Sequence, residues 1–148
     1  MKYFTIAELT SSVTAQKNNI DNTPTPQVVN NLTALADNVL DKARVALGKP
    51  IHVNCGYRSP ALNAKVGGVA NSQHVTGEAA DIESDNNLVL AKTIFQSCPF
   101  DQLILEKPDA QGIPSWVHVS YSQKHNRKQV LKYVVENGKG VYKPYSFS

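Results

Sequence analysis

The chain has 148 residues, of which 41% are hydrophobic, and this length and composition suit a single domain with one core. Its formal net charge is only +3 and it contains no long run of lysine or arginine, which argues against a nucleic-acid-binding protein. No apolar stretch is long enough for a membrane span, and the first residues lack the apolar core of a signal peptide.

The N-terminal third of the chain is predicted to be helical. Thr5 and Glu8 have the spacing of a capping box, which predicts a short helix that ends before the polar segment 11–22. Apolar residues then recur at helical spacing over residues 27–47, and Gly48 ends that pattern. This second helix is the longest predicted element, and its apolar side is expected to pack on the core.

The rest of the chain is predicted to form a sheet with a short helix, which Ser59 caps and Pro60 begins, and one longer helix. The longer helix is capped by Asn86 or Asn87 and runs to Ser97. The order of elements predicts an α+β fold over residues 1–148, with helices packed on a small, mostly antiparallel sheet. Strands are predicted at residues 51–55, 79–82, 103–106, 116–121 and 130–135, followed by a turn at 137–140 that leads into a last strand.

Side chains that bind metals occur at separate places along the chain. His74 and Asp81 flank a turn at Gly77 in a segment of small residues, and His118 shares one face of an alternating strand with Trp116. Two imidazoles and one carboxylate suit Zn²⁺ in a site that keeps its fourth position for water. Scattered histidines are also common as packed or surface residues, so the spacing alone leaves both interpretations open.

The two cysteines, Cys55 and Cys98, do not have the spacing of a metal knuckle. In a chain without an export signal, two buried free thiols are favoured over a disulfide, which stays the alternative. We therefore predict no covalent cross-link in this protein.

Four short motifs follow one another along the chain. They are Gly56-Tyr57-Arg58-Ser59-Pro60, then Asn63, then Ser72-x-His74-x-x-Gly77-x-Ala79-x-Asp81, and finally Trp116-Val117-His118. Together they resemble the zinc D-alanyl-D-alanine carboxypeptidase family, whose relatives include bacteriophage endolysins that cut peptidoglycan stem peptides. The resemblance extends from residue 3 to residue 121, and the C-terminal segment after it matches no motif of this family.

The resemblance implies which residues form the site. It implies that His74, Asp81 and His118 bind one Zn²⁺ ion, and that Arg58 lies beside the metal. A guanidinium group stays charged and offers forked donors, which suits a substrate carbonyl or carboxylate. The remaining residues expected to contact substrate are Tyr57, Ser72, Gln73 and Trp116.

The catalytic base is the point where this chain departs from many relatives. They carry an acidic residue three positions before the last histidine, where this chain has Ser115. We predict that Glu106 takes this role, because an antiparallel pair that puts Glu106 opposite Trp116 also puts it on the face of His118. A surface charge at the strand end is the alternative for Glu106, and Asp109 is a weaker candidate base.

These expectations describe a zinc metallopeptidase that acts on bacterial peptidoglycan stem peptides. It would either remove a terminal D-alanine or cut an L-alanyl–D-amino-acid bond within the stem. The alternative is a catalytically inactive, zinc-containing module that binds a peptide. Because both imidazoles must be neutral to bind metal, activity is expected to fall below about pH 6. We expect a monomer that is made in the cytoplasm and acts on the cell wall after release or by another export route.

Overall fold

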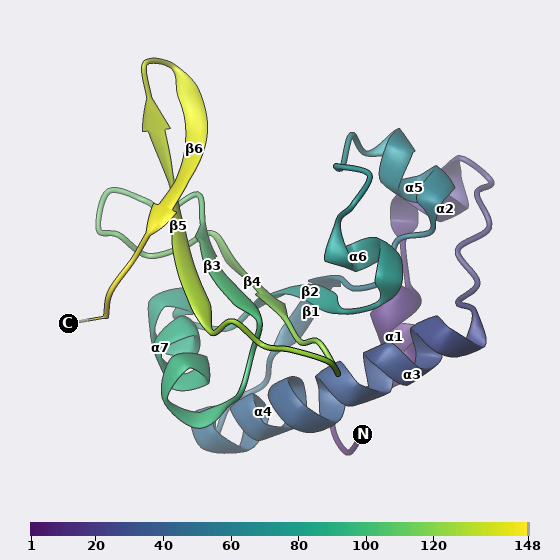
Figure 1. The fold of residues 1–148 in the computed structure, drawn as a ribbon, viewed down its shortest axis with the longest axis horizontal. Helices are drawn as coiled ribbons and strands as arrows, with labels where there is room; N and C mark the ends of the chain where they lie inside the picture. Colours follow the sequence, from purple (N-terminus) through teal and green to yellow (C-terminus); the bar gives the residue numbers. More distant parts are fainter. Residues whose placement is uncertain (148) are drawn as a thin grey trace.

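The computed structural model describes residues 1–147 and places helices against one six-stranded sheet, which confirms the α+β prediction (Figure 1). The strand order across the sheet is β1-β2-β4-β3-β5-β6. The elements are α1 (Ile6–Thr10), α2 (Val13–Lys17), α3 (Pro26–Leu35), the π-helical turn η1 (Ala36–Leu40), α4 (Asp41–Leu47), β1 (His52–Cys55), α5 (Pro60–Lys65), α6 (Gln73–Thr76), β2 (Ala79–Glu83), α7 (Asn87–Ser97), β3 (Gln102–Glu106), β4 (Trp116–Ser120), β5 (Gln129–Glu136) and β6 (Lys139–Pro144).

The first helix begins where the sequence predicts, but the polar segment after it is not without structure. The Thr5 hydroxyl accepts a hydrogen bond from the backbone N–H of Glu8 at 3.1 Å, which confirms Thr5 as the N-cap. Helix α2 forms in the following segment, with Ser12 as its N-cap. It buries only Ala15, so its hydrophobic pattern is too short to reveal a helix.

The long helix is confirmed as the continuous run of α3, η1 and α4. It begins with Pro26 in its first turn and ends at Gly48, whose φ of 71° is the left-handed conformation typical of a helix end. The π-helical turn in its middle buries Ala36, Val39 and Leu40 completely, so it faces the core. No helix within residues 1–147 is both long and apolar enough to cross a membrane.

The sheet is mostly antiparallel, as predicted, and β3 with β5 is its one parallel pair among the described residues. The central hairpin has the register that was assumed for Glu106: Glu106 lies opposite Trp116, and Ile104 lies opposite His118. On its other side, His118 lies opposite Asp81 of β2. The pairing of three strands therefore brings residues from distant parts of the sequence into one row.

The two faces of the sheet have different roles. The helices α3, α4 and α7 cover one face, where alternate strand residues such as Leu103, Val117 and Val119 are completely buried in the core. The intervening residues point to the opposite face, and these include Asp81 and His118. The polar candidates predicted from the sequence thus lie on the face that those helices leave uncovered.

Candidate metal centre and cleft

The Asp81 carboxylate lies between the imidazole rings of His74 and His118. Its Oδ1 atom is 3.4 Å from His74 Nε2 and 3.0 Å from His118 Nδ1. The two rings lie edge to face with centroids 5.1 Å apart. Two ligand atoms about 2.0–2.1 Å from a tetrahedral zinc ion are roughly 3.3 Å from each other. The separations between Asp81 and both imidazoles therefore fit a shared Zn²⁺ ion.

The local fold explains why small residues surround His74. Helix α6 is a single turn, in which the Ser72 hydroxyl accepts from the His74 backbone N–H and Gly77 ends the turn with a φ of 79°. A Cβ atom at Gly77 would lie 2.9 Å from both the backbone oxygen and a methyl group of Val28 in α3. The glycine thus allows both the left-handed turn and the close approach that set His74 beside β2.

The ring of His74 is oriented by a backbone carbonyl. Its Nδ1 atom is 2.7 Å from the Gly56 carbonyl oxygen, which can only accept, so Nδ1 carries the proton. The unprotonated Nε2 then faces Asp81, which is the arrangement that a metal-binding histidine requires. A Cβ atom at Gly56 would lie 2.2 Å from the Leu9 backbone oxygen, so this carbonyl is held against α1.

Cys55 forms a second possible metal-binding set, which the sequence analysis did not include. The ligand atoms of Cys55, His74 and Asp81 all lie within 4.8 Å of one another. However, the Cys55 sulfur is 3.9 Å from Nδ1 of His74, the nitrogen that already donates to Gly56. Burial raises the pKa of the Cys55 thiol to about 11. His118, whose Nδ1 is 3.0 Å from Asp81, is the third ligand that the sequence predicts.

Both cysteines are free, as predicted. Cys98 is buried, and its thiol donates to the Val39 carbonyl at 3.5 Å. Cys55 is only partly buried, which differs from the expectation that both thiols are in the core.

Glu106 is a buried carboxylate and not a solvent-exposed charge at the strand end. It is 9% exposed and lines the same cleft as the three candidate ligands. Burial raises the pKa of Glu106 above its usual range, against the effect of a hydrogen bond that the Tyr142 hydroxyl donates at 3.0 Å. Ser115, at the position of the usual acid, instead donates to the Lys107 carbonyl at 2.7 Å.

Arg58 lines the same cleft and is tied to the metal centre through the backbone. Its backbone N–H donates to the backbone carbonyl oxygen of His74 at 3.0 Å. Its Nε atom is buried and has no hydrogen-bond partner within residues 1–147, where the guanidinium also forms no ion pair. A guanidinium group without a carboxylate partner is available for an anionic or carbonyl group that enters the cleft.

Comparisons with known proteins identify the family of this chain. The family model described as peptidase M15 matches residues 2–120. This chain belongs to the peptidase M15 family. The zinc D-Ala-D-Ala carboxypeptidase of Streptomyces albus G is 52% identical to it over 44 residues, which are 29% of this chain. The matched segment is only 17% of that relative, so most of the relative has no counterpart in this comparison.

The predicted substrate residues divide between two neighbouring cavities of the M15 domain. Ser72, Gln73 and Trp116 line the cleft of about 630 Å³ that contains the candidate ligands. Tyr57 does not, because it is 5% exposed, packs in the core and lines a separate cavity of about 500 Å³. The side chain of Gln73 is already engaged, since it donates to Asp101 at 3.0 Å.

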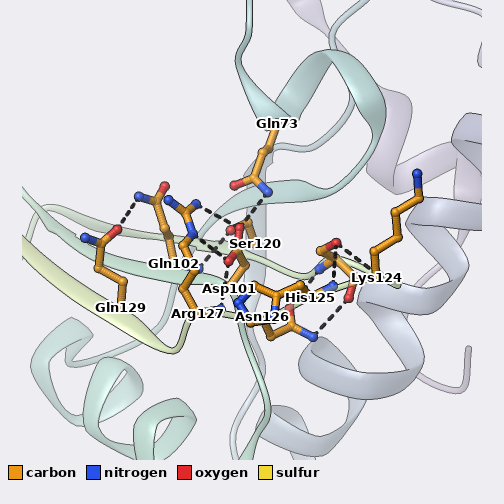
Figure 2. Close-up of polar contacts among 10 residues, drawn as sticks. Gln73, Asp101, Gln102, Ser120, Lys124, His125, Asn126, Arg127 and Gln129 are labelled. Atoms are coloured by element: carbon orange, nitrogen blue, oxygen red, sulfur yellow. Dashed lines mark hydrogen bonds and ion pairs between the residues drawn. The ribbon is translucent and has the colours of Figure 1, made fainter.

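Sequence reasoning missed an ion pair at the edge of this cleft (Figure 2). Figure 2 shows Gln73 and Arg127 converging on Asp101, which is 4% exposed. The Arg127 guanidinium holds the pKa of the Asp101 carboxyl down at about 2. Arg127 lies beyond the M15 match, in the loop before β5. Only the sheet topology brings it next to Asp101, so no local sequence signal could identify the pair.

Proposed function

We propose that this protein is a zinc metallopeptidase that hydrolyses peptide bonds in bacterial peptidoglycan stem peptides. The observation that carries the proposal is one carboxylate, Asp81, within 3.4 Å of two imidazole nitrogens in a cleft that also contains Glu106 and Arg58. Membership of the M15 family supports peptidase chemistry. The name of the matched relative, a zinc D-Ala-D-Ala carboxypeptidase, supports both the metal and the substrate class.

In this proposal His74, Asp81 and His118 hold one Zn²⁺ ion through Nε2, Oδ1 and Nδ1, the atoms that face one another. When bound, zinc would polarise the scissile carbonyl and lower the pKa of the attacking water. The Gly56 carbonyl keeps His74 in the tautomer that binds metal.

Glu106 serves as the general base. Its carboxylate removes the proton from the attacking water and delivers it to the leaving amine, which converts an amide anion into a neutral leaving group. Glu106 fits this role because its burial raises its pKa and because it lines the cleft on the face that carries His118. In this proposal the general base thus lies at the end of β3, the strand next to the one that carries His118, and not at position 115.

Arg58 stabilises negative charge on the substrate. Its guanidinium donates hydrogen bonds to the scissile carbonyl oxygen as charge develops there, or to the terminal carboxylate of a stem peptide. The backbone bond from Arg58 to His74 keeps this charge at a fixed place relative to the metal ligands. Arg58 and Asp81 line both the cleft of about 630 Å³ and the neighbouring cavity of about 500 Å³. The substrate residues on the two sides of the cleaved bond would therefore each have a cavity to occupy.

Digestion of purified peptidoglycan, with the products identified by mass, tests the proposal. Cleavage should require zinc, stop with a chelator and return when zinc is restored. Free D-alanine would identify a carboxypeptidase, whereas stems split after L-alanine would identify an endopeptidase. Cleavage that survives complete removal of the metal would overturn the proposed mechanism.

Glu106→Gln separates the peptidase from an inactive peptide-binding module. The variant should keep one zinc per chain and lose at least ~100-fold in turnover, because only the base is removed. Glu136→Gln is the matched control, since Glu136 lies at the exposed end of β5. Peptide binding without turnover in the wild-type protein, unchanged in Glu106→Gln, would favour the binding module.

A further inference from the structure

The C-terminal hairpin contributes a residue to the cleft although it lies outside the M15 match. Strands β5 and β6 pair with each other, and β5 also joins β3 in parallel. Figure 1 shows this hairpin extending beyond the rest of the sheet at the C-terminal end of the chain. Tyr142 of β6 nevertheless lines the same cleft as His74 and His118. The hairpin is therefore part of the candidate site.

Strand register explains how a tyrosine from β6 reaches this site. Leu105 of β3 pairs with Lys132 of β5, so the next residues, Glu106 and Tyr133, lie in one row of the sheet. Tyr133 in turn pairs with Tyr142 of β6. Strands two apart are roughly 10 Å from each other, so the Tyr142 side chain must cross over β5. Its hydroxyl then donates to Oε1 of Glu106 at 3.0 Å.

The hairpin is built to hold the ring of Tyr142 in this place. Its ring meets that of Tyr133 edge to face, with centroids 5.5 Å apart and planes at 70°. A Cβ atom at Gly140 would lie 2.2 Å from the Tyr133 hydroxyl and 2.4 Å from its ring, so the glycine lets the Tyr133 ring lie directly against β6. Tyr142 thus packs on a neighbouring ring that itself lies against β6.

The hydrogen bond engages only one oxygen of the Glu106 carboxylate. Within residues 1–147, Oε2 makes no hydrogen bond, and Tyr142 is the one side chain that donates to this carboxylate. A carboxylate held by a single donor has a defined orientation and keeps its second oxygen available for a proton. Without that donor, Glu106 could rotate within the cleft.

We propose that Tyr142 is a positioning residue, which orients the Glu106 carboxylate so that its free oxygen faces the attacking water. The kinetic part of this proposal rests on the proposed peptidase function; the orientation of Glu106 does not. Tyr142 touches neither the metal ligands nor the scissile bond in this scheme, and it acts only through Glu106.

A kinetic cycle of four zinc-loaded proteins tests the proposal: the wild type, Tyr142→Phe, Glu106→Gln and the double variant. Tyr142→Phe keeps the ring and removes the hydroxyl, and we expect kcat to fall roughly tenfold with KM unchanged. In the Glu106→Gln background the same change should cost nothing further. An equal loss in both backgrounds, or a raised KM with unchanged kcat, would show that Tyr142 does not act through Glu106.

Tyr145→Phe is the control, because it also removes a tyrosine hydroxyl near the hairpin. Tyr145 follows β6 and lies outside the cleft, and the centroid of its ring is 5.0 Å from that of Phe147. It should keep wild-type kcat.

Crystal structures of the zinc-loaded wild type and Tyr142→Phe supply a test that needs no activity. We expect one Glu106 rotamer in the wild type and a displaced or multiply placed carboxylate in the variant. An unmoved carboxylate would overturn the positioning role. If the wild type cleaves no peptidoglycan, the proposed function fails, and the two structures still decide whether Tyr142 orients Glu106.

Discussion

Asp101 accepts two hydrogen bonds from the guanidinium group of Arg127, from Nε at 2.8 Å and from Nη2 at 2.9 Å. The backbone N–H of Arg127 adds a third bond at 3.0 Å. Because Gln73 also donates to this carboxylate, Asp101 links the loop before β5 to the helix that carries His74. The pair therefore joins the C-terminal part of the chain to the metal centre.

Arg127→Ala should destabilise the protein by about 2 kcal/mol, measured by urea unfolding. Removing one partner of a fully buried ion pair costs roughly 3–5 kcal/mol, but the Arg127 side chain is 49% exposed and solvent weakens its contribution. Lys124→Ala, in the same loop, is the control and should change stability by less than about 0.5 kcal/mol. Equal effects of the two substitutions would contradict the importance of the ion pair.

The contribution of Asp101 should depend on pH. Its pKa is lowered from 3.8 to about 2 in the folded protein, chiefly by Arg127. A depressed pKa stabilises the fold above the unfolded-state value and loses that effect as pH falls through the folded-state value. The stability difference between metal-free wild type and Arg127→Ala should thus be constant above about pH 5 and shrink toward pH 2. A difference that does not change over that range would refute this assignment.

Asp81→Asn should weaken zinc binding by at least ~100-fold, because the amide removes the charge shared by both imidazoles. Metal content after dialysis, together with competition against a chelator, measures the effect. Asp85→Asn is the control: it makes the same chemical change at an exposed position whose ion pair is with Lys49. Equal zinc affinity of wild type and Asp81→Asn would rule out this centre.

Cys55→Ser should retain one zinc per chain, because the thiol lies on the side of His74 that Gly56 occupies. His118→Ala should lose the metal under the same conditions. The opposite pattern, with zinc lost from Cys55→Ser and kept by His118→Ala, would establish the set of Cys55, His74 and Asp81 as the site. Metal analysis of the two purified variants distinguishes these outcomes.

Gly56→Ala should reduce both stability and zinc affinity. The new Cβ would lie 2.2 Å from the Leu9 backbone oxygen, and relief of that clash must move the carbonyl that orients His74. We expect a loss of about 3 kcal/mol in urea unfolding. Gly112→Ala is the control, because its φ of 81° costs about 1 kcal/mol while no atom lies within 4 Å. Only Gly56→Ala should bind zinc more weakly.

Local signals predicted most of the fold. The Thr5 cap and Gly48 mark helix ends because each satisfies or interrupts backbone hydrogen bonding within a few residues. The alternating pattern of β4 was sufficient to predict that Trp116 and His118 share one face of the strand, while the pairing of Glu106 with Trp116 was assumed and is observed in the structure. Such features depend on neighbours in sequence or on a single hairpin, which is why they could be read without the structure.

Contacts that depend on the whole sheet could not be predicted. Asp101 meets Arg127, and Glu106 meets Tyr142, only because β5 returns to pair in parallel with β3. A parallel partner carries no turn signal of its own. The burial of Tyr57 has a related origin, since it is set by core packing around this residue, which also lines the second cavity beside Arg58.

The position of each strand within the sheet gives the two sides of the cleft different stiffness. β4, which carries His118, is hydrogen-bonded to a strand on each side, whereas β6, which carries Tyr142, is an edge strand with one partner. Central strands exchange their amide protons slowest, and edge strands open locally at much lower free energy. The amide protons of β4 beside His118 should thus exchange only on global unfolding, whereas those of β6 should exchange faster through local opening of the sheet edge.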